Sequence, residues 1–373
     1  MTPRERILTV YRGATPDAVP YMLDLSHWFY HKLRKPWDLS VAYLEPEREL
    51  IAYHRRQAVG FYLPNLASFF NVTYGNGVLA SVTRTDAPRG PEVVWKFETP
   101  LGTIRRVRKW EETSYSWAIA DHGLKTEQDL KVLGHALASR QFTPAWERYH
   151  QWVREVGDLG VVYMSPGYSA MGELLSLWMG IEGTMFAVTD WTATIEEVVE
   201  QVNSAWLRLV DLLAQSPAEV ILLGDNFSSD IQSPRFFNLW SRRWYSEAVR
   251  RLHAAGKFVA VHVDGRLRGL LKAFAEIGVD CSDATTPKPM GDLTPQECRD
   301  EAGPRLILSG GIAPNLWTPD VSDDTFEMAV KDWLELRKQS PRLIANAGDQ
   351  VPPGACEHRI PMMRELVENY GRY

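Results

Sequence analysis

Short apolar stretches alternate with longer segments of helical periodicity from about residue 217 to the end of the chain. The apolar stretches are rich in β-branched residues and end in glycine or polar residues, a pattern typical of buried β-strands. Strands that alternate with amphipathic helices build a parallel sheet, because each helix connects one strand to the next. The predicted strands of this half are residues 219–226, 258–265, 278–285, 305–312 and 342–349.

Helix start signals stand between these strands. Ser233 and Thr294 are each followed by proline, and a hydroxyl residue before a proline is typical of a helix N-terminus. The helix that starts after Ser233 is expected to stop at Gly256. A further helix is predicted in residues 322–340, where two aspartates occupy the first turn and interact favourably with the helix dipole.

The first half of the chain is compatible with the same alternation. Strands are predicted at residues 19–26, 59–65, 160–167 and 185–190, and a long helix follows at residues 194–215. Eight or nine strands in one chain of this length favour an α/β fold of the (β/α)8 TIM-barrel type, with residues 1–373 as a single domain. An open, doubly wound sheet is the alternative architecture.

The stretch of about residues 69–118 interrupts this alternation. Its residues alternate in polarity with a period of two, and turn signals stand at residues 75–77 and 99–102. The segment "EVVWKFETPLGTIRRVRKW" predicts two antiparallel strands joined by a tight turn. We therefore expect an antiparallel β-hairpin insertion on the barrel.

Composition and charge restrict the class of protein. The formal net charge is -6, with acids and bases interspersed, which argues against a nucleic-acid-binding protein because such a protein needs a basic surface. No apolar run approaches the roughly 20 residues of a membrane span, and the charged N-terminus does not resemble a signal peptide. Three widely spaced cysteines form no CxxC motif and no disulfide framework, so we expect a cytoplasmic protein.

Polar residues follow almost every predicted strand. In a parallel barrel the carboxyl ends of the strands form the active face, so these side chains are expected to share one opening. Several acids, two histidines and a glycine pair in one place indicate an enzyme site. The residues concerned are Asp24, His27, Ser165, Tyr168, Asp225, Asn226, His262, Asp264, Asp283, Gly310, Gly311, Asn346 and Asp349.

The motif "HVDG" contains the pair with the strongest functional signal. His262 and Asp264 are two residues apart on an extended chain, so both side chains lie on one face. Burial of both requires a partner, which could be a metal, a substrate proton or each other. Structural roles remain open elsewhere: Asp24 and Asp283 could cap the following helices, and His27 could be a packing residue. The glycine pair could serve a turn.

The order of several motifs resembles the uroporphyrinogen decarboxylase superfamily. The motifs are "LLGDN…SPRFF", "VHVDG", "LILSGGI", "GDQVPP" and "ENYG", and the start "RERILTVYRGATPDAVPYMLD" and the segment "TPLGTI" are similar too. The resemblance spans residues 4–370 and implies a (β/α)8 barrel. True uroporphyrinogen decarboxylases bind substrate carboxylates through an N-terminal "RQAGR" stretch. This chain has "YMLDLSHWFYHK" after Pro20, so decarboxylation of a porphyrinogen is doubtful.

The second branch of that superfamily consists of corrinoid-dependent methyltransferases. Their zinc site is a His-x-Cys motif at one strand end and a further cysteine at the last strand end. His262 matches the histidine, whereas Asp264 and Asp349 occupy the two cysteine positions. The resemblance thus implies a candidate zinc site made of His262, Asp264 and Asp349, with Cys356 as an alternative ligand. Oxygen ligands bind zinc less tightly than thiolates and leave it a stronger Lewis acid.

Three functions follow from this resemblance. The first is methyl transfer from a small methoxy or methylamine substrate to a separate corrinoid protein, in which His262, Asp264 and Asp349 activate the leaving heteroatom. The second is cofactor-free decarboxylation of a small acid, in which Asp225 or His262 protonates the carbanion and Arg266, Arg268 or Lys288 are candidate carboxylate-binding residues. Across these reactions the candidate catalytic residues are His262, Asp264 and Asp225. The third is a non-catalytic barrel that binds a small molecule or a partner protein. A homodimer is compatible with all three. The residues expected to bind the substrate are Asp24, His27, Trp28, Asn226, Gly310 and Gly311, with Phe29, Trp191 and Trp317 as further aromatic lining.

Overall fold

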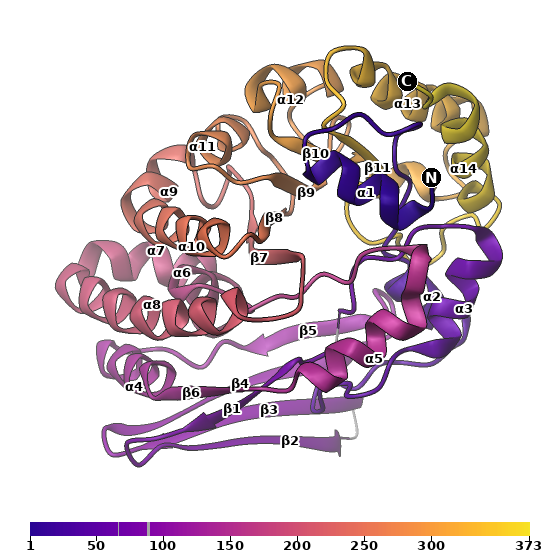
Figure 1. Ribbon diagram of the computed structural model, residues 1–373. Helices are drawn as coiled ribbons and strands as arrows, with labels where there is room; N and C mark the ends of the chain where they lie inside the picture. The colour runs from indigo at the N-terminus through magenta and orange to yellow at the C-terminus, as the bar shows by residue number, and fades with distance from the viewer. Residues whose placement is uncertain (66, 88–89) are drawn as a thin grey trace.

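The computed structural model describes residues 1–65, 67–87 and 90–373 as a mixed α/β fold (Figure 1). Its centre is a five-stranded parallel sheet in the order β11-β10-β9-β8-β7. All five strands lie where the alternation of apolar and polar segments predicted them. Their bounds are β7 (Val220–Phe227), β8 (Phe258–Val263), β9 (Cys281–Thr285), β10 (Ile307–Ile312) and β11 (Leu343–Ala347).

Three N-terminal segments continue this sheet through single parallel bridges. Met22 pairs with Gly60, Phe61 pairs with Gly160 and Met164 pairs with Ile221, while Tyr21 pairs with Ala345 of β11. The segments predicted as strands at residues 19–26, 59–65 and 160–167 therefore contribute isolated bridges, where regular strands were expected. A (β/α)8 barrel has eight regular strands. The structure therefore confirms the mixed α/β class and the parallel sheet, but not the complete barrel.

One buried cluster lies inside these bridged segments. Every one of the eight segments contributes to it, and helix α1 (Pro3–Tyr11) adds its apolar face, including Ile7 and Tyr11. Burial of these side chains is the main favourable contribution to the free energy of folding. The members from the eight segments are Met22, Tyr62, Val161, Tyr163, Val220, Leu222, Ala260, Cys281, Ile307 and Ile344.

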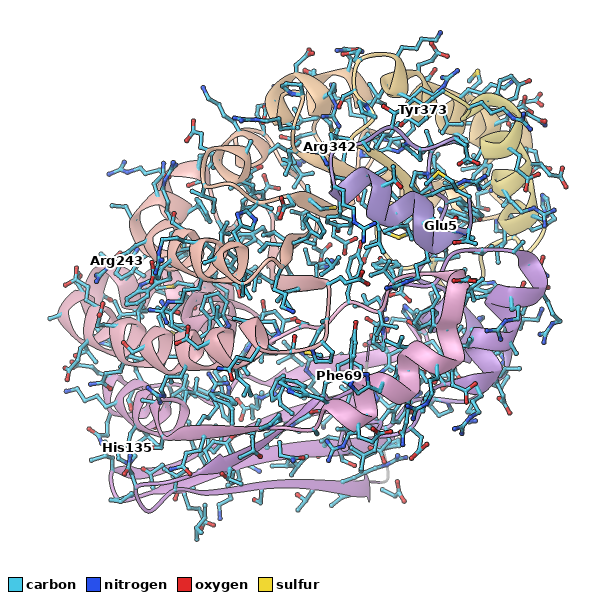
Figure 2. All side chains as sticks on the ribbon, in the orientation of Figure 1. Glu5, Phe69, His135, Arg243, Arg342 and Tyr373 are labelled. Atoms are coloured by element: carbon cyan, nitrogen blue, oxygen red, sulfur yellow. The ribbon has the colours of Figure 1, made fainter. Side chains whose placement is uncertain are left out.

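The two ends of the chain meet beside this cluster (Figure 1). Val19 N donates to Gly371 O at 2.8 Å, and Arg342 donates a hydrogen bond of 3.1 Å to Tyr11 O. Figure 2 shows Arg342 beside α1. These contacts connect α1 to the last strand, so the N-terminal end of the sheet is covered and its carboxyl end remains the accessible one.

Helices surround the parallel sheet. Ser233 and Thr294 each accept a hydrogen bond at a helix N-terminus, as the sequence predicted, and Ser322 does the same at the start of α13. The helix expected from Ser233 to Gly256 is divided at Ser241 into α9 and α10. The bounds are α2 (Ser26–Lys32), α3 (Arg48–Gln57), α4 (Glu127–Ala138), α5 (Trp146–Val156), α6 (Ala170–Gly172), α7 (Gly180–Asp190), α8 (Thr192–Ala214), α9 (Pro234–Trp240), α10 (Arg242–Ala254), α11 (Leu270–Glu276), α12 (Pro295–Ala302), α13 (Asp323–Glu335) and α14 (Arg359–Tyr370).

The strand predicted at residues 185–190 is wrong, because these residues form the end of α7. The segment "MFAVTD" is short and apolar, and an apolar run of this length cannot distinguish a strand from a buried helical segment. The helix begins upstream at Gly180, within residues that carry no strand signal. Met185 and Val188 pack against a second apolar cluster, which α4 and α8 share.

Antiparallel strands form a separate layer below the parallel sheet in Figure 1. The predicted hairpin is present as β3 and β4, with Thr99 paired to Gly102 at its turn. The layer is larger than one hairpin, because β2 and β5 extend it to four strands, and β1 pairs with β6 nearby. Residues 88–89 of the predicted range lie outside the described part of the chain. The bounds are β1 (Phe70–Tyr74), β2 (Leu79–Ala87), β3 (Gly90–Thr99), β4 (Gly102–Glu111), β5 (Ser116–Asp121) and β6 (Arg140–Pro144).

The glycine pair of β10 is required by packing. Gly311 has φ +113°, and a Cβ there would lie 2.4 Å from the Trp333 ring; a Cβ on Gly310 would lie 2.1 Å from Thr285 O. We expect Gly311→Ala to lower the free energy of unfolding by about 3 kcal/mol or more, because backbone strain and overpacking add. Urea unfolding followed by tryptophan fluorescence would measure the change.

The matched control is Gly256→Ala. Gly256 also has a positive φ, +73°, but a Cβ there meets no atom within 4 Å. Backbone strain alone predicts that Gly256→Ala lowers the free energy of unfolding by about 1 kcal/mol. Equal losses for the two variants would contradict the contribution assigned to Trp333.

Among the described residues, none of the helices combines the length and the apolar character that crossing a bilayer requires.

Candidate functional site

A cavity of about 480 Å³ opens at the carboxyl ends of the parallel strands. Residues from the N-terminal bridged segments, β7, β8 and the loop after β11 line it, together with one residue of the antiparallel layer. We call it the strand-end cavity. Figure 2 shows Phe69, which lines it, above the antiparallel strands. The polar and aromatic lining residues are Asp24, Tyr62, Asn65, Phe69, Arg108, Tyr163, Ser165, Tyr168, Asn226, His262, Asp264, Asp349 and Gln350.

His262 and Asp283 form a buried pair at this cavity. They are paired residues in the register of β8 and β9, and His262 Nδ1 lies 3.3 Å from Asp283 Oδ2. The side chain of His262 is 19 % exposed and that of Asp283 is fully buried. Burial by itself would lower the pKa of His262, but the hydrogen bond and charge of Asp283 raise it to about 9, with smaller contributions from Asp349 and Asp264. His262 is therefore an imidazolium at neutral pH.

Asp264 and Asp349 lie in the same cavity as His262. The backbone of Asp264 is held by a hydrogen bond of 2.8 Å from its N–H to Phe227 O. Burial raises the pKa of Asp349 to about 6, and the positive charge of His262 opposes that rise. The structure thus brings together the three residues that the sequence selected for this site.

Arg108 reaches the strand-end cavity from β4. Its side chain is mostly buried, and burial lowers its pKa. Among the described residues no carboxylate forms a salt bridge with it, and its Nε has no hydrogen-bond partner. Arg108 stands on a predicted hairpin strand, where a polar residue is typical of a solvent-facing position, so the sequence carries no signal for it.

With this geometry in place, comparison with known proteins identifies the family. Residues 173–370, more than half of the chain, match the family model described as Uroporphyrinogen decarboxylase (URO-D). The chain belongs to the uroporphyrinogen decarboxylase family. The match contains β7 to β11, and with them His262, Asp264, Asp283 and Asp349.

Members of different activity can share this family's architecture. A solved structure titled "methyltransferase from Methanosarcina mazei" superposes with a TM-score of 0.62 and 13 % identity, over 99 % of each chain. At that identity the likeness concerns the fold. None of the curated proteins compared matches the chain.

The donor set of the strand-end cavity differs from the zinc site of the methyltransferase branch. His262 is bound to Asp283 through Nδ1, and carboxylates replace both thiolates. Across residues 1–65, 67–87 and 90–373, no three His, Cys, Asp or Glu side chains are grouped so that they could hold a metal ion. In this arrangement His262, Asp264 and Asp349 do not fit a zinc centre. Zinc binding stays a prediction from the resemblance, and the reaction proposed below does not depend on it.

Asp24 and Asn226 also lie where the sequence predicted them. Asp24 Oδ1 accepts from Ser26 N at 2.9 Å, and Oδ2 accepts from Asn65 Nδ2 at 2.6 Å and from Gln350 Nε2 at 3.0 Å. Because the Asp24 carboxylate already accepts these hydrogen bonds, it holds Ser26, Asn65 and Gln350 in place in the cavity wall. Asn226 adopts a left-handed conformation with φ +48°, a conformation that asparagine tolerates better than most residues.

Asp225, a predicted catalytic residue, does not line the strand-end cavity. Its Oδ1 accepts from Ser169 N at 2.7 Å, and Oδ2 accepts from the Ser169 hydroxyl. Burial raises its pKa to about 6, although the bonds from Ser169 oppose the rise. Side chains alternate between the two faces of a strand, so Asp225 points away from the face that presents Gly224 and Asn226. In this structure it anchors the start of α6.

The predicted aromatic and histidine contacts of the N-terminal segment lie elsewhere. His27 donates to Tyr115 O at 2.9 Å and lines a small adjacent pocket of about 120 Å³. Trp28 is 3 % exposed and donates to Ala355 O. Phe29, Trp191 and Trp317 also pack in apolar clusters. The aromatic lining consists of Tyr62, Phe69, Tyr163 and Tyr168. Tyr168 lies at the opening as predicted, whereas the pattern of apolar positions did not distinguish the other three from core residues.

The candidate cations Arg266, Arg268 and Lys288 lie at the surface. Arg266 pairs with Asp230, whereas Arg268 and Lys288 both pair with Glu297. Exposed pairs of this kind contribute little to stability. None of the three lines the strand-end cavity, so Arg108 is the residue that supplies an arginine there.

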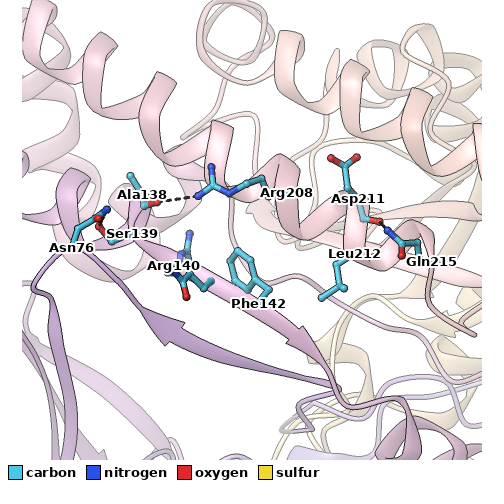
Figure 3. Close-up of a pocket in the computed structure, with 10 residues that line it drawn as sticks. Asn76, Ala138, Ser139, Arg140, Phe142, Arg208, Asp211, Leu212 and Gln215 are labelled. Atoms are coloured by element: carbon cyan, nitrogen blue, oxygen red, sulfur yellow. Dashed lines mark hydrogen bonds between the residues drawn. The ribbon is translucent and has the colours of Figure 1, made fainter.

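A second hollow, of about 450 Å³, lies between β6 and α8 (Figure 3). Arg208 Nη2 crosses part of it to donate to Ala138 O at 3.0 Å, and Asp211 and Gln215 stand farther along α8. No strand of the parallel sheet ends here. The strand-end cavity is therefore the better candidate for a catalytic site.

Proposed function

We propose that the chain transfers a methyl group from a small methoxy or methylamine substrate, bound at the mouth of a (β/α)8 barrel, to a corrinoid carried by a separate protein. The observation that carries this proposal is the His262–Asp283 pair, since it presents a protonated imidazole to the strand-end cavity. The methyltransferase whose structure is similar supports the same reaction class.

The proposed reaction breaks the bond between the methyl carbon and its oxygen or nitrogen. A corrinoid on the separate protein would supply, as cobalt(I), the electron pair that forms the new bond to the methyl carbon. The electron pair of the broken bond stays on the leaving heteroatom. His262 then donates a proton to that atom from Nε2, the ring nitrogen that Asp283 does not bind. General acid catalysis of this kind typically contributes about 100-fold to 10 000-fold to the rate.

Asp283 acts as a positioning residue in this scheme. It fixes the orientation of the imidazole and maintains its proton, while Asp264 and Asp349 add negative charge that also favours the imidazolium. Tyr62, Phe69 and Tyr168 provide apolar walls that exclude water from the leaving heteroatom.

Decarboxylation is the second candidate, and Arg108 favours it because it supplies an arginine in the cavity. In that reaction the bond to the carboxyl carbon breaks, carbon dioxide leaves, and the electron pair remains on the substrate carbon. His262 would protonate that carbon. Both candidates therefore depend on the same proton donor and differ in the bond that breaks.

One assay separates the candidates. The purified chain is incubated with cob(I)alamin and a panel of methoxy-aromatic acids and methylamines, and methylcobalamin is followed by its absorbance while released carbon dioxide is trapped. Methylcobalamin formation above the rate without protein supports methyl transfer. Carbon dioxide release without methylcobalamin contradicts it in favour of decarboxylation. Absence of both products contradicts the two catalytic candidates and favours a binding protein.

A further inference from the structure

Arg108 is a partly buried arginine with few hydrogen bonds from its guanidinium. Nη1 donates to Trp117 O at a long 3.4 Å, and Nε is buried with no partner. A guanidinium has five N–H donors, and leaving them without acceptors away from water is unfavourable. Within the described part of the chain, no acid lies within 4 Å to compensate its charge. An arginine with free donors in a cavity is suited to bind an anionic ligand, because its N–H groups can pair with the oxygens of that ligand.

The neighbouring Arg106 also has a buried Nε without a hydrogen-bond partner among the described residues, but its guanidinium packs on aromatic rings. It stacks over Trp95 at 4.1 Å and over Trp178 at 5.2 Å, and the charge of Glu173 acts on it. Arg106 does not line the strand-end cavity. The two arginines are two residues apart on β4 and both are partly buried, but of the two only Arg108 lines the cavity.

The acids of the cavity do not serve Arg108. Asp264 and Asp349 act on His262, and Asp24 accepts from its neighbours Ser26, Asn65 and Gln350. Burial lowers the pKa of Arg108, and among the described residues the Tyr168 hydroxyl opposes that shift. The cavity thus contains an arginine, Arg108, with which none of these described acids forms a salt bridge.

We infer that Arg108 binds a carboxylate of the substrate, so that the substrate is an organic acid whose reacting group extends toward His262. A single guanidinium matches one negative charge, and its planar pair of N–H groups matches the two oxygens of a carboxylate. This inference deepens the proposed function and rests on it in one respect, because it takes the strand-end cavity as the substrate site. It names the substrate class for methyl transfer, which that reaction does not specify by itself, whereas decarboxylation already requires an acid.

Calorimetric titration tests the inference with 4-methoxybenzoate and its uncharged counterpart 4-methoxybenzamide. We expect the unaltered chain to bind the acid at least tenfold more tightly than the amide, and Arg108→Met to lose that preference. Arg108→Lys, which keeps the charge without the planar fork, should retain part of it. Arg105→Met is the matched control, because Arg105 is exposed on the same strand and should leave the preference unchanged.

Two outcomes overturn the inference: the unaltered chain shows no preference for the acid, or Arg108→Met keeps it. Tighter binding of 4-methoxyphenylphosphonate than of 4-methoxybenzoate would also overturn it, in favour of a dianion site. Thermal unfolding without ligand tests for a merely structural role of Arg108. Such a role predicts a large loss of Tm in Arg108→Met, whereas a binding role predicts a Tm close to that of the unaltered chain. Binding is measured without turnover, so these outcomes are independent of whether methyl transfer or decarboxylation is observed.

Discussion

Replacing His262 by glutamine is expected to lower kcat/KM by about 100-fold to 10 000-fold, the range that a general acid typically contributes. Glutamine preserves a polar side chain of similar length, but it cannot donate a proton to a leaving atom. The expectation holds for methyl transfer and for decarboxylation, since both use the same donor. Initial rates over a range of substrate concentrations, in the assay that separates the two candidates, would measure the change.

The matched control for this variant is His253→Gln. His253 also pairs with an aspartate, with Nε2 at 2.8 Å from Asp280 Oδ2, but this pair is partly exposed and lies before β9, at the opposite end of the sheet. We expect its loss to leave kcat/KM unchanged. An activity of His262→Gln within threefold of that of the control would rule out proton donation by His262.

Replacing Asp283 by asparagine is expected to move the alkaline limb of the pH–rate profile to lower pH. Asp283 is the largest favourable contribution that raises the pKa of His262 to about 9, against the opposing effect of burial. If the pKa returned to the ordinary value of about 6.5, the protonated fraction at pH 8 would fall from about nine-tenths to about 3 %. The rate at pH 8 should therefore fall about 30-fold, and the loss should shrink as the pH is lowered toward 6.

The same pKa shift has a consequence for stability. A group whose pKa is raised in the folded state stabilises the protein below its unfolded pKa, and this contribution is lost as the pH rises through its folded pKa. For His262 the loss falls between about pH 6.5 and pH 9. Urea unfolding across that range should show a smaller loss in Asp283→Asn than in the unaltered chain.

Asp280→Asn is the control for the aspartate variant, because it removes the carboxylate partner of His253 and leaves the strand-end cavity intact. Its pH–rate profile should match that of the unaltered chain. A pH–rate profile for Asp283→Asn that keeps its alkaline limb near pH 9 would show that Asp283 does not hold the proton of His262.

Local patterns predicted the parallel half of the molecule well. β7 to β11 lie at the predicted positions because buried strands of a parallel sheet are continuous apolar runs, and this signal does not depend on distant residues. The caps at Ser233 and Thr294 were equally predictable, since a helix N-terminus is satisfied by a side chain within three residues. The three N-terminal segments were less predictable. Each joins the sheet through an isolated bridge, and such a bridge depends on the position of the adjacent segment in the fold.

The sequence by itself determined which chemistry-bearing residues stand at strand ends, and therefore that His262, Asp264 and Asp349 share one opening. Their positions follow from the period of each strand and from the common direction of parallel strands. The tertiary structure alone decided how that chemistry is arranged. The register of β8 and β9 selected Asp283 as the partner of His262, and packing of the antiparallel layer brought Arg108 into the cavity. Both contacts join segments whose relative placement depends on the packing of the whole chain, so no local pattern of residues could encode them.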